Sequence, residues 1–270
     1  MDTDQEQAGV AWQLGIWNRI SEIYAREIDQ RFAPVVDGVI ARAALTAGQH
    51  VLDLGTGTGA VAERAAQMVG PQGHVVGVDM SPDMLAFAQR RMAGGGLTNV
   101  SLREGRAESL PAENATFDVV LASLSLMYVL DRAAAAREIA RVLRPQGRLV
   151  ATVWAGPAQC DIVLFQQTAG RFAGPSPVPG VGPGALADPT LFLQQLAAGG
   201  IQARVEQEML GFTFDTFAAA WEALAGVTTA HLPPERQQEA KGAVMAAMYP
   251  QGDGPRHFRN TTQFILGWVG

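Results

Sequence analysis

Residues 51–59 constrain the fold of this chain more than any other segment. The apolar run at residues 51–54, broken only by Asp53, leads into three glycines at alternate positions, Gly55, Gly57 and Gly59. Glycine lets a chain turn sharply and lets a ligand approach the backbone. A second apolar run ends in Asp79, 20 residues after Gly59 (79 − 59), where a carboxylate can accept hydrogen bonds from a ribose diol. The spacing predicts a strand–turn–helix unit that binds an adenosine-containing cofactor.

The charge of Asp53 favours one cofactor class over another. The glycines alone do not decide, because Gly55–Ala60 also fits the G-x-G-x-x-A form of the dinucleotide fingerprint. A dinucleotide places its pyrophosphate on the helix N-terminus, where the Asp53 carboxylate would repel it. S-adenosylmethionine (SAM) has no phosphate and carries an ammonium and a sulfonium, both favoured by a nearby acid. We therefore predict SAM, with Asp53 acting on its ammonium directly or through water; an NAD-dependent protein is the weaker alternative.

Strand and helix signals alternate between residues 45 and 155, which predicts a parallel sheet. Helices are expected at about 60–69, 81–94 and 131–143, and a fifth strand at 148–154 after a turn at 145–147. Ser81 and Pro82 are typical of the first residues of a helix. An apolar helical stripe that includes Trp12, Ile16 and Ile20 predicts one or two helices before this core.

Four further motifs follow the glycine run in a characteristic order. They are Ser81–Leu85, Gly105–Pro111, Phe117–Ser123 and Arg141–Leu149. With these motifs the chain resembles the class I SAM-dependent methyltransferases over residues 45–155, and most resembles their UbiE-like small-molecule branch. The resemblance implies a Rossmann-like, seven-stranded, mostly parallel sheet with helices on both faces. It also implies N-terminal helices that cap the cofactor and a helical lid inserted near the C-terminal strands.

The resemblance implies an activity as well. A methyl group would pass from SAM to an oxygen or carbon of a small, largely apolar acceptor of the quinone, aromatic, isoprenoid or polyketide kind, leaving S-adenosylhomocysteine (SAH). Two alternatives stay open: an enzyme that uses bound SAM without methyl transfer, such as a cyclase or decarboxylase, and a non-catalytic SAM-binding subunit. The acceptor's identity stays open, as does the methylated atom.

The same resemblance assigns residues to the cofactor. The expected set is Tyr24, Asp53, Gly55, Thr56, Gly57, Gly59, Asp79, Met80, Ala107, Glu108, Ala122 and Ser123. Many relatives have Asp where this chain has Arg106, so the acceptor for the adenine amino group shifts to Glu108 or a backbone carbonyl, and Arg106 is expected on the surface. Met80 would lie over the adenine, and Tyr24 near the methionine end of SAM.

Catalytic groups are harder to find in the sequence. Tyr128, His231 and His257 are the weak candidates, whereas His50 and His74 stand at strand starts, far from the expected cofactor. The histidines are not at metal-ligand spacing, and no metal is expected. Aromatic residues of the C-terminal part, including Phe165, Phe212 and Trp221, should be mostly core, with a minority lining an apolar acceptor pocket.

Composition excludes several other classes of protein. A chain of 270 residues with a net charge of −6 has no basic field for nucleic acid. The one cysteine, Cys160, allows neither an internal disulfide nor a cysteine-based zinc cluster. No apolar run approaches the ~20 residues of a membrane span, and the N-terminal residues are acidic. These features predict a cytoplasmic protein without stable membrane insertion, and the oligomeric state stays open between monomer and homodimer.

We predict a single methyltransferase domain over residues 1–270. Its expected parts are cap helices (1–44), a SAM-binding core (45–155), a Gly/Pro-rich loop (156–188) densest at 170–184, and C-terminal strands (189–270) with lid helices at 216–249.

Overall fold

A seven-stranded sheet with strand order β3-β2-β1-β4-β5-β7-β6 organises the molecule. The structure, a computed structural model, describes residues 3–174 and 178–270. The strands are β1 (His50–Leu54), β2 (His74–Asp79), β3 (Val100–Glu104), β4 (Phe117–Ser123), β5 (Leu143–Trp154), β6 (Ile201–Phe214) and β7 (Arg256–Val269). Strands β1 to β5 are parallel, and β7 lies antiparallel between β5 and β6. The predicted fold class is confirmed.

The central strands are apolar because both faces of the sheet are covered. Val51 and Leu52 on β1 and Val119 and Val120 on β4 are fully buried. Helices shield both faces of such a sheet from water, so its inner strands consist of continuous runs of apolar residues. Since the strands are parallel, the residues that follow β1, β2 and β4 meet at one edge.

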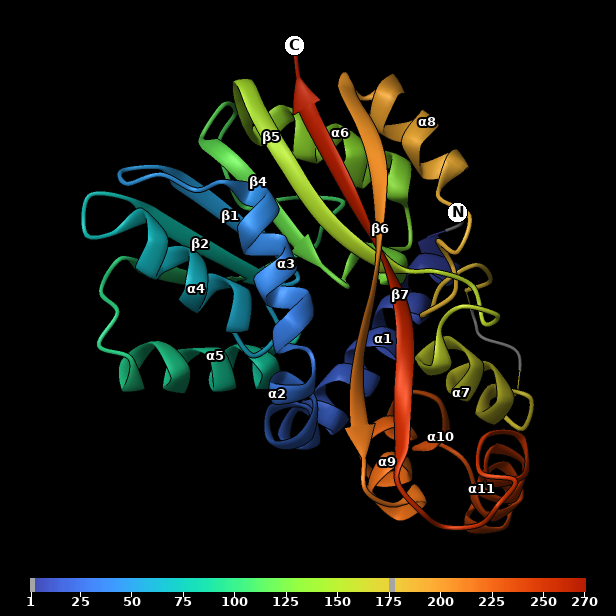
Figure 1. The fold of residues 1–270 in the computed structure, drawn as a ribbon. Coiled ribbons are helices and arrows are strands. Elements are labelled where there is room, and N and C mark those ends of the chain that lie inside the picture. The colour runs from blue at the N-terminus through green and yellow to red at the C-terminus, as the bar shows by residue number, and fades with distance from the viewer. Residues whose placement is uncertain (1–2, 175–177) are drawn as a thin grey trace.

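Two layers of helices cover the sheet (Figure 1). One face carries α3 (Ala33–Ala43), α4 (Ala60–Val69) and α5 (Pro82–Gly94), and the other carries α6 (Arg132–Val142) and α8 (Thr190–Ala198). The predicted helix starts are confirmed by caps: Ser81 Oγ accepts from the Met84 N–H at 3.1 Å, and Asp131 Oδ1 from the Ala134 N–H at 2.9 Å.

The N-terminal helices cross the carboxyl edge of the sheet. Helix α1 (Thr3–Ile23) continues into a π-helical turn η1 (Tyr24–Ile28) and a short helix α2 (Asp29–Arg31) before α3. Ile16 and Ile20 of the predicted apolar stripe are buried and pack with Met84 of α5. The stripe therefore docks α1 beside the start of α5.

Strands β6 and β7 run beyond the sheet into a helical cluster (Figure 1). This cluster consists of α7 (Asp161–Gly170), α9 (Phe217–Leu224), α10 (Gly226–Thr229) and α11 (Pro234–Met248). Phe217 packs against Tyr249 at 5.0 Å, and Phe165 against Trp221 at 5.9 Å, between ring centroids. The helices expected at 216–249 are present, with α10 as an addition.

Two local predictions were wrong. The segment 156–188 is not loop throughout, because α7 occupies 161–170, where Val163 and Phe165 form a buried face. Residues 175–177 of that predicted loop lie outside the described residues. Strand β5 begins at Leu143 and not at Arg148, and the expected turn lies within it. There Gln146 has φ +64° and the β4–β5 register shifts.

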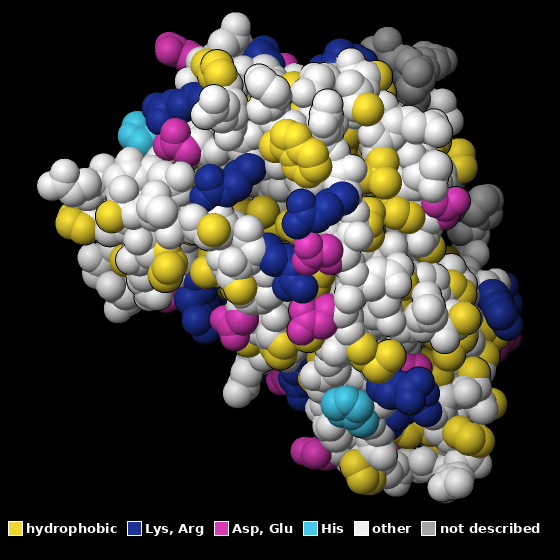
Figure 2. Space-filling model, turned by 45° about the horizontal axis from the view of Figure 1, so that its top comes forward, with side chains coloured by type: hydrophobic (Ala, Val, Ile, Leu, Met, Phe, Trp, Pro, Cys, Tyr) yellow, Lys and Arg dark blue, Asp and Glu magenta, His cyan; other side chains and the backbone are white. Residues whose placement is uncertain are grey.

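Charges of both signs are interspersed on the face shown in Figure 2. Hydrophobic side chains are scattered between them, and no broad basic field is visible on this face. This distribution gives that face no attraction for a polyanion.

Candidate functional site: the glycine loop and two joined cavities

The loop after β1 is held against the end of β2. The backbone N–H groups of Gly55 and Thr56 both donate to the Val78 carbonyl, at 2.8 and 3.0 Å. Gly57 has φ +53°, and a Cβ built on it would meet no atom within 4 Å. The loop therefore presents bare backbone to open space beside the sheet edge.

Asp79, at the end of β2, connects this loop to α5. Its Oδ2 accepts from the Gly57 N–H at 2.8 Å, and its Oδ1 accepts from the Ser81 N–H at 2.9 Å. Burial raises the pKa of Asp79, while its hydrogen bonds from Ser81, Gly57 and Met80 act in the opposite direction. Two oxygens offer about four lone-pair sites, so the Asp79 carboxylate keeps some unused acceptor capacity, and Asp79 lines the cavity.

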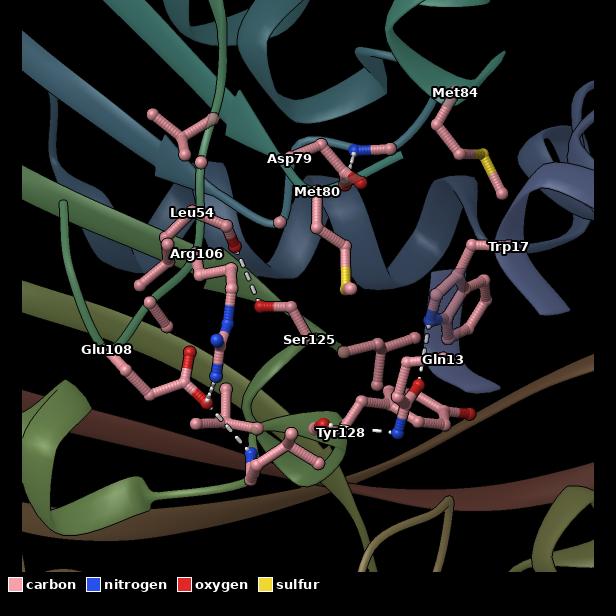
Figure 3. Close-up of a pocket in the computed structure, with 18 of the residues that line it drawn as sticks. Gln13, Trp17, Leu54, Asp79, Met80, Met84, Arg106, Glu108, Ser125 and Tyr128 are labelled. Carbon is pink, nitrogen blue, oxygen red and sulfur yellow. Dashed lines mark hydrogen bonds and ion pairs between the residues drawn. The ribbon is translucent and has the colours of Figure 1, made fainter. Parts of the chain in front are cut away.

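A cavity of about 130 Å³ opens in front of the loop (Figure 3). Its walls include eight of the predicted cofactor residues: Tyr24, Gly55, Gly57, Asp79, Met80, Ala107, Glu108 and Ser123. Helix α1 supplies Gln13 and Trp17 to the opposite side. Ligand pockets usually measure ~300–1,000 Å³, so this cavity is smaller than most ligand pockets.

Arg106 is part of this cavity, contrary to the prediction that it lies on the surface. It lines the wall and forms ion pairs with Glu6 of α1 at 3.0 Å and with Glu108 at 3.3 Å. Glu108 also accepts from the N–H groups of Leu130 and Asp131, at 3.1 and 3.3 Å. The Gly105–Glu108 motif therefore connects α1 to the start of α6.

Four predicted cofactor residues lie behind the cavity wall and do not line it. Asp53 is 1% exposed, and its Oδ2 accepts from Thr56 Oγ1 at 2.6 Å. Burial raises the pKa of Asp53 to about 7. Thr56 and Ala122 are buried as well. Any effect of Asp53 on a bound cation acts through the loop or through water.

Gly59, the fourth, is a packing glycine. It has φ +86°, and a Cβ there would lie 3.0 Å from the Ala88 Cβ and 2.9 Å from the Met92 side chain of α5. Gly55 is similarly constrained, because its Cβ would lie 2.4 Å from the Ser125 Cβ. The glycine run serves close packing at both ends and the cavity at Gly55 and Gly57.

A second cavity of about 720 Å³ adjoins the first. The two share Gln13, Trp17 and Tyr128 as walls. Gln13 Nε2 donates to the Tyr128 carbonyl at 3.3 Å, and Trp17 Nε1 donates to Gln13 Oε1 at 3.1 Å, as Figure 3 shows. These three side chains therefore lie where the two cavities meet.

The second cavity is mainly apolar, although its walls are not those expected. They come from α1, α7, the segment after residue 178 and α10, and include Trp12, Ile16, Val163, Val181, Val227 and Leu232. Phe165, Phe212 and Trp221 do not line it and pack in the core. The apolar pocket therefore depends on α1 and on valines more than on the aromatic residues of the lid.

The structure separates the three catalytic candidates. Tyr128 belongs to a short 3-10 turn, η2 (Leu126–Tyr128), and lines both cavities. Burial raises the pKa of its phenol, so the phenol is protonated near neutral pH and can donate a hydrogen bond. His231 is exposed in the wall of the second cavity. His257 lies on β7 away from both, 3.1 Å from Thr213 Oγ1.

Among the polar and aromatic residues of the site, sequence reasoning missed Gln13, Trp17 and Ser125 and misplaced Arg106. Gln13 and Trp17 lie on the same helix as the predicted stripe, and their spacing of four residues placed them together on a face next to it. Ser125 follows Leu124, whose φ of +54° turns the chain so that Ser125 Oγ donates to the Leu54 carbonyl at 2.7 Å. Arg106 was recognised as an unusual residue but assigned to the surface.

The chemistry of the first cavity fits SAM. Open space at Gly57 admits a ligand to the backbone, and Asp79 offers unused acceptor capacity to a diol. Asp79 and Glu108 are its acidic wall residues, and Arg106, its basic one, is already paired with two glutamates. Such a wall favours a cationic cofactor over a pyrophosphate.

Comparison with known proteins defines the class. Residues 45–168 match the family model described as "Methyltransferase domain". The YcgJ protein from Bacillus subtilis has a similar fold, with a TM-score of 0.62 at 20% identity over 87% of this chain and 97% of that one. Residues 45–168 therefore match a methyltransferase domain, the class of domain that uses SAM as its cofactor, and the chain has the fold of the solved structure.

Curated relatives give the branch. UbiE, the ubiquinone/menaquinone biosynthesis C-methyltransferase of Vibrio campbellii, is 39% identical over 111 residues, which cover 41% of this chain and 43% of that protein. An arsenite methyltransferase of Halobacterium salinarum is 39% identical over 109 residues, covering 40% of this chain and 28% of that protein. The domain is UbiE-like, and the chain spans less than half the length of these relatives.

Within residues 3–174 and 178–270, no three His, Cys, Asp or Glu side chains are grouped so that they could hold a metal ion. No helix of the described chain is long and apolar enough to cross a membrane.

Proposed function

We propose that this protein transfers the methyl group of SAM to an oxygen or carbon of a small, largely apolar acceptor. The observation that carries the proposal is the pair of joined cavities, one lined by the glycine loop and Asp79 and the other apolar, sharing Gln13, Trp17 and Tyr128. When bound in the first cavity, SAM supplies a methyl group activated by its sulfonium. The protein then has to position the acceptor and exclude water.

The second cavity is the proposed acceptor site. Its volume of about 720 Å³ falls within the usual range for ligand pockets of ~300–1,000 Å³. Among the described residues, its walls contain no Asp, Glu, Lys or Arg. An ionised acceptor would lose its hydration there without gaining a counter-charge. These walls support an acceptor that is neutral when it enters.

Side-chain amides give the acceptor site its polar character. Gln166 is buried with both ends of its amide used: its Nε2 donates to the Leu224 carbonyl at 2.6 Å, and its Oε1 accepts from the Thr228 hydroxyl. Gln167 and His231 are exposed and lie in the cavity wall. An acceptor carrying a carbonyl or hydroxyl can exchange hydrogen bonds with these two groups while its body packs against the apolar walls.

The two relatives methylate chemically different acceptors, as their names state, although both are 39% identical to this chain over the aligned residues. Identity of this degree therefore does not indicate the acceptor. In this chain Cys160 is buried, and burial raises the pKa of its thiol to about 12. A thiol in that state is a poor ligand for arsenic, which supports an organic acceptor.

The proposal is tested with methyl-labelled SAM and an extract of neutral small molecules, including phenols and quinols. We expect label to appear in an apolar organic product together with formation of SAH. An unlabelled product formed only in the presence of intact SAM would contradict methyl transfer and support the non-methylating alternative.

A cavity-filling variant tests the acceptor site with the product found in that way. Ala185 lines the second cavity and not the first. Ala185→Phe should lower kcat/KM for the acceptor by on the order of 100-fold, as expected for a misplaced nucleophile, and leave the Kd for SAH unchanged. Ala93→Phe, at an exposed position of α5, is the matched control. Equal effects of the two variants would contradict the assignment.

Three broader expectations remain part of the proposal. The chain functions as one methyltransferase domain over residues 1–270, works in the cytoplasm, and is a monomer or homodimer. Support for the location is the single buried cysteine, which suits a reducing compartment.

A further inference from the structure

The turn that carries Tyr24 into the cofactor cavity is π-helical. In η1 the Asp29 N–H donates to the Tyr24 carbonyl, the five-residue spacing of a π-helix. Short π-helical segments are rare and often occur at functional sites. Tyr24 lines the cofactor cavity, and its ring meets Trp17 and Phe32 edge-on, at 6.5 and 6.2 Å between centroids.

The side chain of Asp29 binds the glycine loop from behind. Its two oxygens lie 2.7 and 2.8 Å from Thr58 Oγ1, which donates to the carboxylate. Thr58 is 2% exposed and stands between Gly57, which lines the cavity, and Gly59, which packs on α5. One carboxylate therefore joins the end of the π-helical turn to the centre of the loop.

Arg91 of α5 completes the connection. Its guanidinium forms an ion pair with Asp29, and its Nε donates to the Thr58 carbonyl at 2.9 Å. Another guanidinium nitrogen pairs with Glu63 at 3.1 Å. None of Asp29, Thr58, Arg91 and Glu63 lines either cavity. Asp29, Thr58 and Arg91 therefore touch no ligand in either cavity and act only through the backbone and side chains that they hold. Glu63 pairs with Arg91 and has no part in the connection between Asp29 and the loop.

We propose that Asp29 is a positioning residue that fixes the π-helical turn to the glycine loop and thereby sets the place of Tyr24 in the cofactor cavity. The inference deepens the proposed function and rests on it, because Tyr24 faces the cofactor only if SAM or SAH occupies the first cavity. Two contacts support the proposal. Asp29 forms an ion pair with Arg91, and its hydrogen-bond partner Thr58 belongs to the glycine loop itself.

Binding of SAH to the full chain, measured by calorimetry, tests this assignment. Asp29→Asn keeps the size of the side chain but removes its charge and turns an amide donor toward Thr58 or Arg91. We expect the Kd for SAH to rise about tenfold, the effect of losing about 1.4 kcal/mol of binding. Thr58→Val, which removes the hydroxyl donor with little change in shape, should raise the Kd in the same direction.

A double-mutant cycle separates positioning from a general loss of structure. If Asp29 acts through Tyr24, Asp29→Asn should add no further rise in Kd to Tyr24→Leu. A merely structural Asp29 would instead give the same factor in both backgrounds, and that outcome would overturn the proposal. Urea denaturation of each variant shows that the folded protein is being titrated.

Glu63→Gln is the matched control, because it removes the other carboxylate on Arg91 without touching Asp29 or Thr58. We expect its Kd for SAH to equal that of the wild type. An unchanged Kd in both Asp29→Asn and Thr58→Val would also overturn the proposal. Failure of the wild-type protein to bind SAH at all is a different result, which contradicts the proposed function itself.

Discussion

Replacing Asp79 with Asn should weaken cofactor binding and leave the fold intact. The carboxylate accepts one backbone N–H on each oxygen, from Gly57 at 2.8 Å and Ser81 at 2.9 Å. Two oxygens offer about four lone-pair sites, and the Met80 N–H is a third backbone donor to this carboxylate, so about one site remains for a hydroxyl of a ribose. An Asn side chain keeps one oxygen and turns an NH₂ group toward the other donor.

The expected magnitude follows from that count. The variant loses about one acceptor position for the ribose together with the negative charge that strengthens hydrogen bonds to it. Hydrogen bonds to charged groups contribute ~1.5–3 kcal/mol, and part of this is recovered because the amide is cheaper to bury. We expect a net loss of ~1–3 kcal/mol, equivalent to a Kd for SAH raised about 5- to 150-fold.

Calorimetric titration with SAH measures the effect. Asp83→Asn is the matched control, since Asp83 is exposed on the first turn of α5, four residues further along the chain. It removes the same charge from the same helix end but from outside the cavity. A Kd unchanged in Asp79→Asn, or raised equally in both variants, would refute the assignment of Asp79 to the ribose.

Two further predictions concern the loop. Gly59→Ala should destabilise the protein by ~1–3 kcal/mol more than Gly96→Ala, since both glycines have positive φ but only Gly59 has neighbours within 4 Å of the added Cβ; equal urea midpoints would contradict this. Burial raises the pKa of Asp53 to about 7, whereas an Asp in the unfolded chain titrates near 4. Between about pH 4 and 7, Asp53 is therefore protonated in the folded state and ionised in the unfolded state. Stability from this group is therefore full below pH ~4 and lost as the pH rises through ~7. The free energy of unfolding of the ligand-free protein should fall between pH 5 and 8 more steeply than that of Asp53→Asn, and parallel curves would refute the shift.

The sequence was most informative where chemistry depends on neighbours along the chain. The glycine run, Asp79 at a strand end and the Ser81 cap lie within short segments whose function requires that local order. Parallel strands then bring such segments to one edge whatever the rest of the chain does. That is why seven of the twelve expected cofactor residues share one cavity, where Tyr24 of η1 joins them.

Contacts between distant segments could not be predicted in this way. Gln13 contacts Tyr128, 115 positions away in the sequence, and Arg106 contacts Glu6, 100 positions away. These contacts depend on how α1 docks. An apolar stripe predicts which face of the helix packs inward, but it does not predict how far along its axis the helix is placed. Asp53 is a different case. Its charge indicated the cofactor class, but the sequence did not show that its side chain is buried behind the loop.

The central claim is that the cavity at the glycine loop is a SAM site, and parallel calorimetric titrations of the wild-type protein with SAH and with NAD test it most directly. We predict saturable binding of SAH and no detectable binding of NAD. Binding of NAD without binding of SAH would contradict the claim.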